Sequence, residues 1–182
     1  MLQPNFSPFP TLTTRRLILR KLKYEDEQEI YELRTNEEVN QFLDRERAKS
    51  VEDARKFINK ILKGIFDNEA ILWAINLNDN DRLIGSVVYY NISIKDSRGE
   101  IGYELNPAQQ GKGIMQEALE PVIQFGFEQL GFETIEAWPT EKNTRSIQLL
   151  EKFDFKKVIE DPRLRMPHNK GMLLYSLSRI SK

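Results

Sequence analysis

The sequence contains no cysteine, and its 182 residues include a single histidine, His168. The missing thiols exclude disulfide bonds, thiolate metal sites and a cysteine acyl-enzyme intermediate. One histidine is too few for a histidine-rich metal centre, so we expect no metal site. Any chemistry must therefore use carboxylates, hydroxyls, amides and backbone groups.

Long apolar runs and a strong net charge are also missing. No stretch reaches the roughly 18 uninterrupted apolar residues that a membrane span requires, and residues 1–16 lack the charged-then-apolar order of a signal peptide. The 27 Lys and Arg residues nearly balance the 28 Asp and Glu residues, which leaves no general attraction to nucleic acid or to anionic membranes. We therefore expect a cytoplasmic protein that binds neither a nucleic acid nor a membrane.

The rest of the composition is that of an ordinary globular protein, with 40% hydrophobic and 30% charged residues. A chain of this length suits one domain with a substantial core and is short for two. The sequence shows no internal repeat, low-complexity tract or linker. Residues 1–182 are therefore expected to form a single domain.

The spacing of apolar residues predicts alternating strands and helices. Strands are expected at residues 16–22, 70–77, 83–94, 100–105, 134–138, 155–159 and 172–177. Helices are expected at residues 24–43, as one helix or a broken pair, at 51–66, from 113 to about 131, and at 143–153. This order predicts an α/β fold of the mixed α+β kind, with a central mixed seven-stranded sheet and helices packed on both faces.

Residues 160–171 form a long segment without a predicted element. The segment is polar and interrupted by prolines, as lids and binding loops often are. A mobile surface loop is an equally good interpretation of the same composition.

Two glycines precede the long helix and follow the strand at residues 100–105. The residues of this turn are Gln110, Gly111, Lys112, Gly113, Ile114 and Met115. The first turn of a helix carries unpaired N–H groups and the positive end of the helix dipole, and glycines let a diphosphate approach the backbone. The segment therefore predicts an anion site, although a plain flexible turn has the same composition.

The spacing of these glycines differs from that of two common nucleotide-binding motifs. A P-loop requires glycine where Asn106 stands, and serine or threonine where Gly113 stands. A Rossmann fingerprint requires a third glycine at the position of Gln116. The glycine spacing therefore weakens both the P-loop and the Rossmann interpretations.

Residues 110–115 (QGKGIM) resemble the acetyl-CoA motif Q/R-x-x-G-x-G/A of the GNAT superfamily of acetyl-CoA-dependent N-acetyltransferases. Gln110 and Gly113 match this motif, and Met115 departs from it. Further similarity lies in residues 13–22 (TTRRLILRKL), 100–106 (EIGYELN), 117–119 (EAL) and 143–155 (NTRSIQLLEKFDF). In this order the segments look like the branch of ribosomal-protein N-terminal acetyltransferases, the RimJ/RimL-like proteins. The resemblance implies acetyl-CoA as the co-substrate.

The resemblance also implies roles for residues of the last predicted helix. Asn143 and Ser146 would lie near the sulfur and the pantetheine arm, and the backbone N–H near Leu105 would polarise the thioester oxygen. Many members protonate the departing thiolate with a tyrosine seven residues after the asparagine, where this chain has Leu150. In the resembling branch a serine three residues after the asparagine takes this role, which implies Ser146.

Several of these residues have a second interpretation. Asn143 is also a good helix N-cap, and Arg145 is either a partner for a CoA phosphate or a solvated charge. Asp154 stands where the family usually has glycine, and aspartate tolerates the left-handed backbone of such a turn. The expected acetyl-CoA-binding residues are Leu105, Gln110, Gly111, Lys112, Gly113, Ile114, Met115, Asn143 and Arg145.

Two carboxylates are candidates for the base that deprotonates the acceptor amine. Glu100 and Glu104 lie four residues apart on one strand and so project from the same face. Glu104 is nearer the glycine turn and is the first candidate, with Glu100 second; two solvated carboxylates are the alternative. An α-amino group is about a tenth neutral at pH 7, whereas a lysine is almost fully charged, so a weak base suffices for an N-terminus.

These observations predict an enzyme that transfers acetyl from acetyl-CoA to a primary amine, by direct attack in a ternary complex. A protein or peptide N-terminal α-amino group is the expected acceptor. A small-molecule amine acetyltransferase and a non-catalytic acyl-CoA-binding module are the alternatives. Since relatives in this branch are often dimers, a homodimer is also expected.

Overall fold

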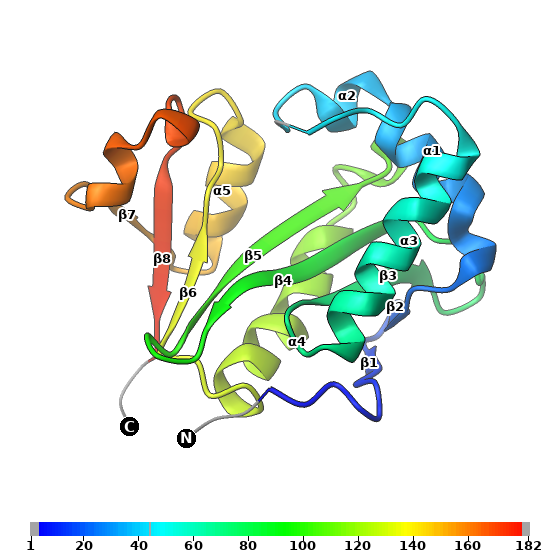
Figure 1. Ribbon diagram of the computed structural model, residues 1–182, viewed down its shortest axis with the longest axis horizontal. Helices are drawn as coiled ribbons and strands as arrows, with labels where there is room; N and C mark the ends of the chain where they lie inside the picture. The colour runs from blue at the N-terminus through cyan, green and yellow to red at the C-terminus, as the bar shows by residue number, and fades with distance from the viewer. Residues whose placement is uncertain (1–3, 44, 180–182) are drawn as a thin grey trace.

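The computed structural model describes residues 4–43 and 45–179. Its strands are β1 (Leu12–Thr13), β2 (Leu17–Lys21), β3 (Ile71–Leu77), β4 (Gly85–Ser93), β5 (Arg98–Leu105), β6 (Thr134–Ala137), β7 (Lys156–Val158) and β8 (Leu174–Ser178). Its α-helices are α1 (Glu27–Thr35), α2 (Glu37–Asn40), α3 (Val51–Phe66), α4 (Ile114–Glu128) and α5 (Thr144–Lys152). The described part of the chain thus forms one mixed sheet with helices on both sides (Figure 1).

The strands lie in the order β1-β2-β3-β4-β5-β6-β8-β7. Neighbouring strands are antiparallel except β5 and β6, which are parallel. A parallel pair needs a crossover connection, and α4 supplies it. The single parallel contact therefore lies beside the helix that follows the glycine turn.

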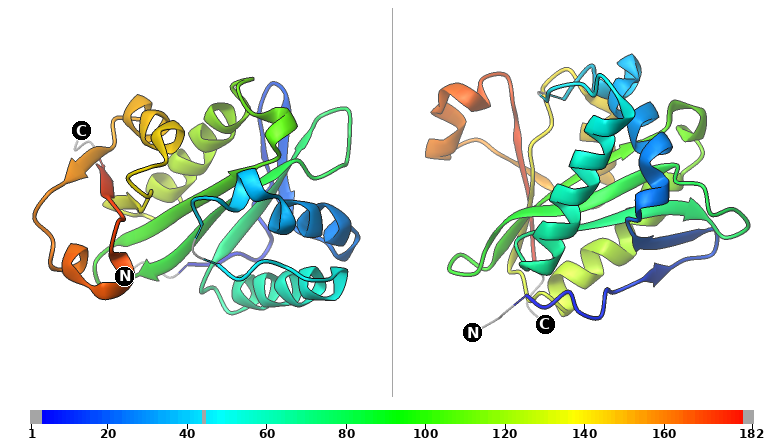
Figure 2. Two further views of the ribbon diagram at one scale, coloured as in Figure 1. Left: turned by 90° about the horizontal axis from the view of Figure 1, so that it is seen from above. Right: turned by 45° about the vertical axis from the view of Figure 1, so that its right-hand side comes forward.

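The alternation of side chains along β3 divides the core between two faces of the sheet. Ile71, Trp73 and Ile75 join the cluster that packs against α4. Leu72 and Ala74 join the cluster that packs against α1 and α3. Figure 2 shows these helices on opposite sides of the sheet, which confirms the expected arrangement.

The segment at residues 24–43 is a broken pair of helices. A short 3₁₀ turn (Tyr24–Asp26) leads into α1, and the chain is extended at Asn36 between α1 and α2. The Asn36 side chain accepts a hydrogen bond from the Val39 N–H at 3.0 Å, so it caps α2. By contrast, α3 has the bounds that the sequence predicts.

The sheet has eight strands among the described residues, so the expected number of seven is wrong. The additional strand is β1, whose two residues pair with Ile18 and Leu19 of β2. Two residues are too few to show the period-two alternation by which a strand is found in a sequence.

The segment at residues 160–171 is fastened to β6. Arg163 forms two hydrogen bonds with the Glu136 carboxylate, at 2.7 and 2.8 Å, and two with Asp161, at 2.9 and 2.7 Å. These bonds raise the pKa of the Arg163 guanidinium, which also lies 5.5 Å from the centre of the Trp138 ring. Paired bonds of this kind hold a side chain firmly, so the structure favours an ordered segment over a mobile loop.

No helix in residues 4–43 and 45–179 is long and apolar enough to cross a membrane. Within the same ranges, no group of three or more His, Cys, Asp and Glu side chains is placed to hold a metal ion.

The parallel pair of β5 and β6 is short. Its register joins Arg98 to Thr134, Gly99 to Ile135 and Glu100 to Glu136, and β5 then continues to Leu105 without β6 beside it. β6 ends before Trp138-Pro139, and a proline has no N–H to continue a ladder. The two strands therefore separate, as Figure 1 shows.

Glu117 in the first turn of α4 ties this helix to the turn between β1 and β2. Its carboxylate accepts hydrogen bonds from Thr14 Oγ1 at 2.6 Å, Arg16 Nε at 2.6 Å and the Arg16 backbone N–H at 2.8 Å. Burial raises the pKa of Glu117, but these hydrogen bonds together lower it by more, so the net shift is downward. The carboxylate thus holds the N-terminus of α4 in place.

The Glu117→Gln variant should lose about 1–2 kcal/mol of unfolding free energy at neutral pH, because the charged acceptor of Arg16 is removed. A lowered folded-state pKa contributes stability above the unfolded-state pKa, and this contribution is lost as the pH falls through the folded-state pKa. The difference between variant and wild type should therefore shrink towards about pH 3. Urea unfolding at both pH values measures this. Glu120→Gln, on the exposed side of the same helix, is the control; equal stability of the Glu117 variant and wild type at neutral pH would contradict the prediction.

Candidate active site

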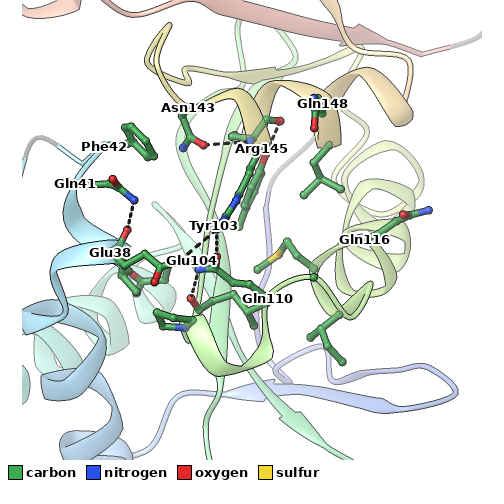
Figure 3. Close-up of a pocket in the computed structure, with 18 of the residues that line it drawn as sticks. Glu38, Gln41, Phe42, Tyr103, Glu104, Gln110, Gln116, Asn143, Arg145 and Gln148 are labelled. Carbon is green, nitrogen blue, oxygen red and sulfur yellow. Dashed lines mark hydrogen bonds and ion pairs between the residues drawn. The ribbon is translucent and has the colours of Figure 1, made fainter.

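A cleft of about 670 Å³ opens where β5 leaves β6. One wall comes from α2 and the residues after it, and the other from the glycine turn, α4 and α5, as Figure 3 shows. The lining residues used below are Glu38, Phe42, Leu43, Tyr103, Glu104, Leu105, Gln110, Gly111, Gly113, Ile114, Met115, Asn143, Arg145 and Ser146. The structure therefore brings most of the sequence-predicted residues together.

The glycine turn has the backbone that the sequence suggests. Gly111 and Gly113 both have a φ of 73°, in the left-handed region that glycine adopts at no steric cost. Gly113 is the N-cap of α4, so the N–H groups of Ile114 and Met115 lie in the unpaired first turn. A Cβ on Gly111 would meet no atom within 4 Å, which leaves the backbone open to an approaching ligand.

Arg145 is a cation of α5 that lines the cleft. Its Nη1 donates to Gln110 Oε1 at 2.7 Å and lies 3.3 Å from Glu38 Oε1. Lys112 does not line the cleft, and its Nζ lies 3.3 Å from Gln109 Oε1. This geometry therefore supports a contact between the Arg145 side chain and a bound anion. It gives no support to a contact from the Lys112 side chain.

The N–H of Leu105 faces the edge of β5 that β6 has left. The next residue, Asn106, donates its N–H to the Ile84 carbonyl on the β4 side at 2.8 Å. Alternate residues of a strand direct their backbone groups to alternate edges, so the Leu105 groups point away from β4. The Leu105 carbonyl accepts a hydrogen bond from Gln110 Nε2 at 3.2 Å, which agrees with this direction.

Asn143 and Ser146 lie at the start of α5. Asn143 Oδ1 accepts a hydrogen bond from the Ser146 N–H at 3.1 Å, so Asn143 is the N-cap and also lines the cleft. Leu150 is buried in the core, a position that suits its apolar side chain. Asp154 has a φ of 62°, so it occupies the left-handed position of the expected glycine.

Tyr103 was not among the sequence-predicted site residues. Its Oη lies 2.8 Å from Ser146 Oγ, and both side chains line the cleft. Burial raises the pKa of Tyr103 to about 12, although the hydrogen bond with Ser146 lowers it somewhat. In the sequence, Tyr103 stands two residues from both Ile101 and Leu105, so the three side chains share one face of the strand. This is the pattern of a core face, and it gives no sign that the Tyr103 hydroxyl reaches a site.

Glu104 lines the cleft from the opposite face of β5. Its Oε2 lies 2.6 Å from Arg45 Nη2, and its Oε1 accepts a hydrogen bond from Ser86 Oγ at 3.4 Å. Arg45 Nε in turn donates to Asn40 Oδ1 at 2.7 Å. The negative charge of Glu104 is thus compensated by an arginine that no motif in the sequence marked.

Glu100 does not line the cleft. Asn91 Nδ2 donates to its carboxylate at 3.1 Å, and Arg98 Nη1 lies 4.0 Å away. Burial raises the pKa of Glu100, although the hydrogen bond from Asn91 lowers it. The geometry therefore supports Glu104 over Glu100 as the carboxylate that serves this site.

All of residues 160–171 are described, and none lines the cleft. The idea that this segment closes over the site therefore gains no support from the structure. His168 lies in the same segment.

A family model for the acetyltransferase (GNAT) domain matches residues 16–156. The uncharacterized N-acetyltransferase YoaA of Bacillus subtilis is 34% identical over 149 residues, which cover 82% of this chain and 84% of that protein. The uncharacterized N-acetyltransferase p20 of Bacillus licheniformis is 33% identical over 147 residues, or 81% of this chain and 83% of that protein. The chain therefore belongs to the GNAT acetyltransferase family, and it is an enzyme, an N-acetyltransferase.

Solved structures share the fold at lower sequence identity. A putative ribosomal-protein-serine acetyltransferase from Vibrio cholerae has a TM-score of 0.81 at 22% identity, covering 94% of this chain and 99% of that one. RimL, a ribosomal L7/L12 alpha-N-protein acetyltransferase in complex with coenzyme A, has a TM-score of 0.80 at 16% identity, covering 93% and 98%. These likenesses show the fold alone.

The Gly113→Ala variant should bind coenzyme A about tenfold more weakly, because a side chain in left-handed backbone costs about 1–2 kcal/mol and shifts the turn. Isothermal titration calorimetry with coenzyme A measures the change. Gly64→Ala is the matched control, since Gly64 lies inside α3, where a Cβ would make an ordinary 3.7 Å contact with Ala70. Unchanged affinity of the Gly113 variant would show that the turn does not hold the ligand.

Proposed function

We propose that this N-acetyltransferase transfers the acetyl group of acetyl-CoA to the α-amino group of a protein or peptide N-terminus, by direct attack in a ternary complex. One observation carries the proposal. The cleft joins the glycine turn on one face of the sheet to Glu104 on the other, around the open edge of β5. A cofactor and an amine can therefore meet beside the Leu105 N–H.

The residues of the cleft suit acetyl-CoA. The first-turn N–H groups of α4, the Arg145 cation and the Gln110 amide would hold the pyrophosphate, and Asn143 would lie near the pantetheine arm. Acetyl-CoA supplies an activated thioester when bound. The Leu105 N–H, which faces the open edge, would stabilise negative charge on the thioester oxygen.

A carboxylate base suits an acceptor amine that loses its proton easily. Glu104 lines the cleft beside its partner Arg45 and would accept the proton directly or through water. An α-amino group has a pKa of about 7.7–8.0 and a lysine of about 10.4, so the N-terminus is the better match. A RimJ/RimL-like role agrees with the shared fold of RimL.

Direct transfer agrees with the side chains that line the cleft. Among them are no cysteine and no histidine. The Ser146 hydroxyl is hydrogen-bonded to another hydroxyl rather than to a base, and a serine nucleophile requires a base. A cytoplasmic location and a homodimer stay predictions from the sequence.

Initial rates measured against both substrates should give intersecting double-reciprocal lines, and mass spectrometry should place the acetyl group on the peptide N-terminus. Peptides with a free N-terminus should be acetylated faster than matched peptides with a blocked N-terminus and a free lysine. Parallel lines would contradict direct transfer. Acetylation of small amines alone would indicate a small-molecule enzyme, and binding without turnover on any amine would indicate an acyl-CoA-binding module.

The Glu104→Gln variant should lower kcat/KM for the amine by about tenfold to a thousandfold, because it removes the carboxylate that takes the proton. Affinity for acetyl-CoA should change little. Glu100→Gln is the matched control, since it makes the same change on the same face of β5 outside the cleft. Equal losses in both variants would remove Glu104 from its proposed role.

A further inference from the structure

The cleft holds two hydroxyls that touch each other, and neither has a role in the function proposed above. Tyr103 comes from β5 and Ser146 from α5, and their oxygen atoms are 2.8 Å apart. This is the usual separation of a good O–H···O hydrogen bond. The pair lies in the same cleft as the Leu105 backbone and Asn143.

The direction of this hydrogen bond decides what Ser146 can do. If Ser146 were the donor, the Tyr103 hydroxyl would have to donate to another acceptor. The acceptor that the structure offers it is the Ser146 carbonyl, which is 3.4 Å away. That contact is long for an O–H donor. With Tyr103 as the donor, its hydrogen makes the 2.8 Å bond, and the Ser146 hydrogen is free for a group in the cleft.

Tyr103 is suited to remain a donor. Its raised pKa, caused by burial, keeps the phenol protonated throughout the range in which an amine acceptor reacts. The position that many family members fill with a tyrosine is Leu150, which is buried in the core. The phenol in this cleft therefore comes from β5 instead of α5.

We propose that Tyr103 is a positioning residue: it donates its hydrogen bond to Ser146 Oγ, and so directs the Ser146 hydroxyl hydrogen at the departing coenzyme A sulfur. This inference rests on the proposed function. In the step concerned, the amine nitrogen bonds to the acetyl carbon, the carbon–sulfur bond breaks, and its electron pair stays on sulfur. The proton that the amine loses passes to Glu104, directly or through water, and Ser146 keeps its hydrogen while it hydrogen-bonds to the released thiolate.

A hydrogen bond to the thiolate lowers the pKa of the bound thiol. The affinity of the wild-type enzyme for coenzyme A, relative to desulfo-coenzyme A, should therefore rise as the pH is raised from neutral, with a limit of about tenfold above the pKa of the free thiol if the shift is one pKa unit. In Tyr103→Phe and in Ser146→Ala this rise should disappear. The tyrosine ring is kept in Tyr103→Phe, so a role confined to packing would leave the rise unchanged.

Turnover provides a second readout. Tyr103→Phe should lower kcat with little change in the KM for acetyl-CoA, and the double variant should be no slower than Ser146→Ala, because the two hydroxyls act as one unit. Tyr175→Phe is the control, since Tyr175 Oη also makes a hydrogen bond, to Glu151 at 3.1 Å, outside the cleft. It should match wild type in both experiments.

The two experiments separate the inference from the proposed function. If no amine is acetylated, the proposed function fails, and the comparison of coenzyme A with desulfo-coenzyme A still decides the role of Tyr103. If the wild-type affinities show no pH-dependent difference, or if Tyr103→Phe keeps that difference, the inference is wrong. Additive losses in the double variant would also overturn it.

Discussion

The separation of β5 from β6 beyond Glu100 is the constraint on which the rest of the site depends. β5 continues to Leu105 while β6 ends before Trp138-Pro139, so the last residues of β5 have no neighbouring strand on the β6 side. The same gap lets side chains from both faces of the sheet reach one cleft. Tyr103 comes from the α4 face and Glu104 from the α1 face of a single strand, and a fully paired sheet would have kept them apart.

Ion pairs then hold the irregular segments around this opening. Arg16 binds Glu117 and fixes the first turn of α4. Arg45 binds Glu104 and joins the chain after α2 to the cleft floor, while Glu136 fastens the 160–171 segment through Arg163. Each pair contains a carboxylate with little solvent exposure, and such a carboxylate requires a partner because an unpaired buried charge is costly. The irregular segments are ordered for this reason.

The comparisons show the family of the chain and do not identify its acceptor. Relatives at 34% and 33% identity carry no named acceptor, and structures with the same fold fall to 16% identity. The wall that contains the glycine turn offers backbone N–H groups to the cleft, and these depend weakly on the other side chains. The opposite wall of the cleft includes the side chains of Phe42 and Leu43, which can differ from one member to the next.

The sequence by itself determined the features that repeat at short range. The period of apolar residues located α3, the crossover of α4 and seven of the eight strands that the structure describes, and the glycine spacing located the turn at Gly111 and Gly113. Contacts between distant segments were decided by the tertiary structure alone: the partner of Glu104 is 59 residues away, and that of Tyr103 is 43 residues away. Side-chain alternation assigned Tyr103 to the core, because a sequence pattern specifies the face of a strand and not where the neighbouring strand ends. The same limit explains why the sequence could rank Glu104 above Glu100 only by its nearness to the glycine turn, while the end of β6 placed Glu104 in the cleft.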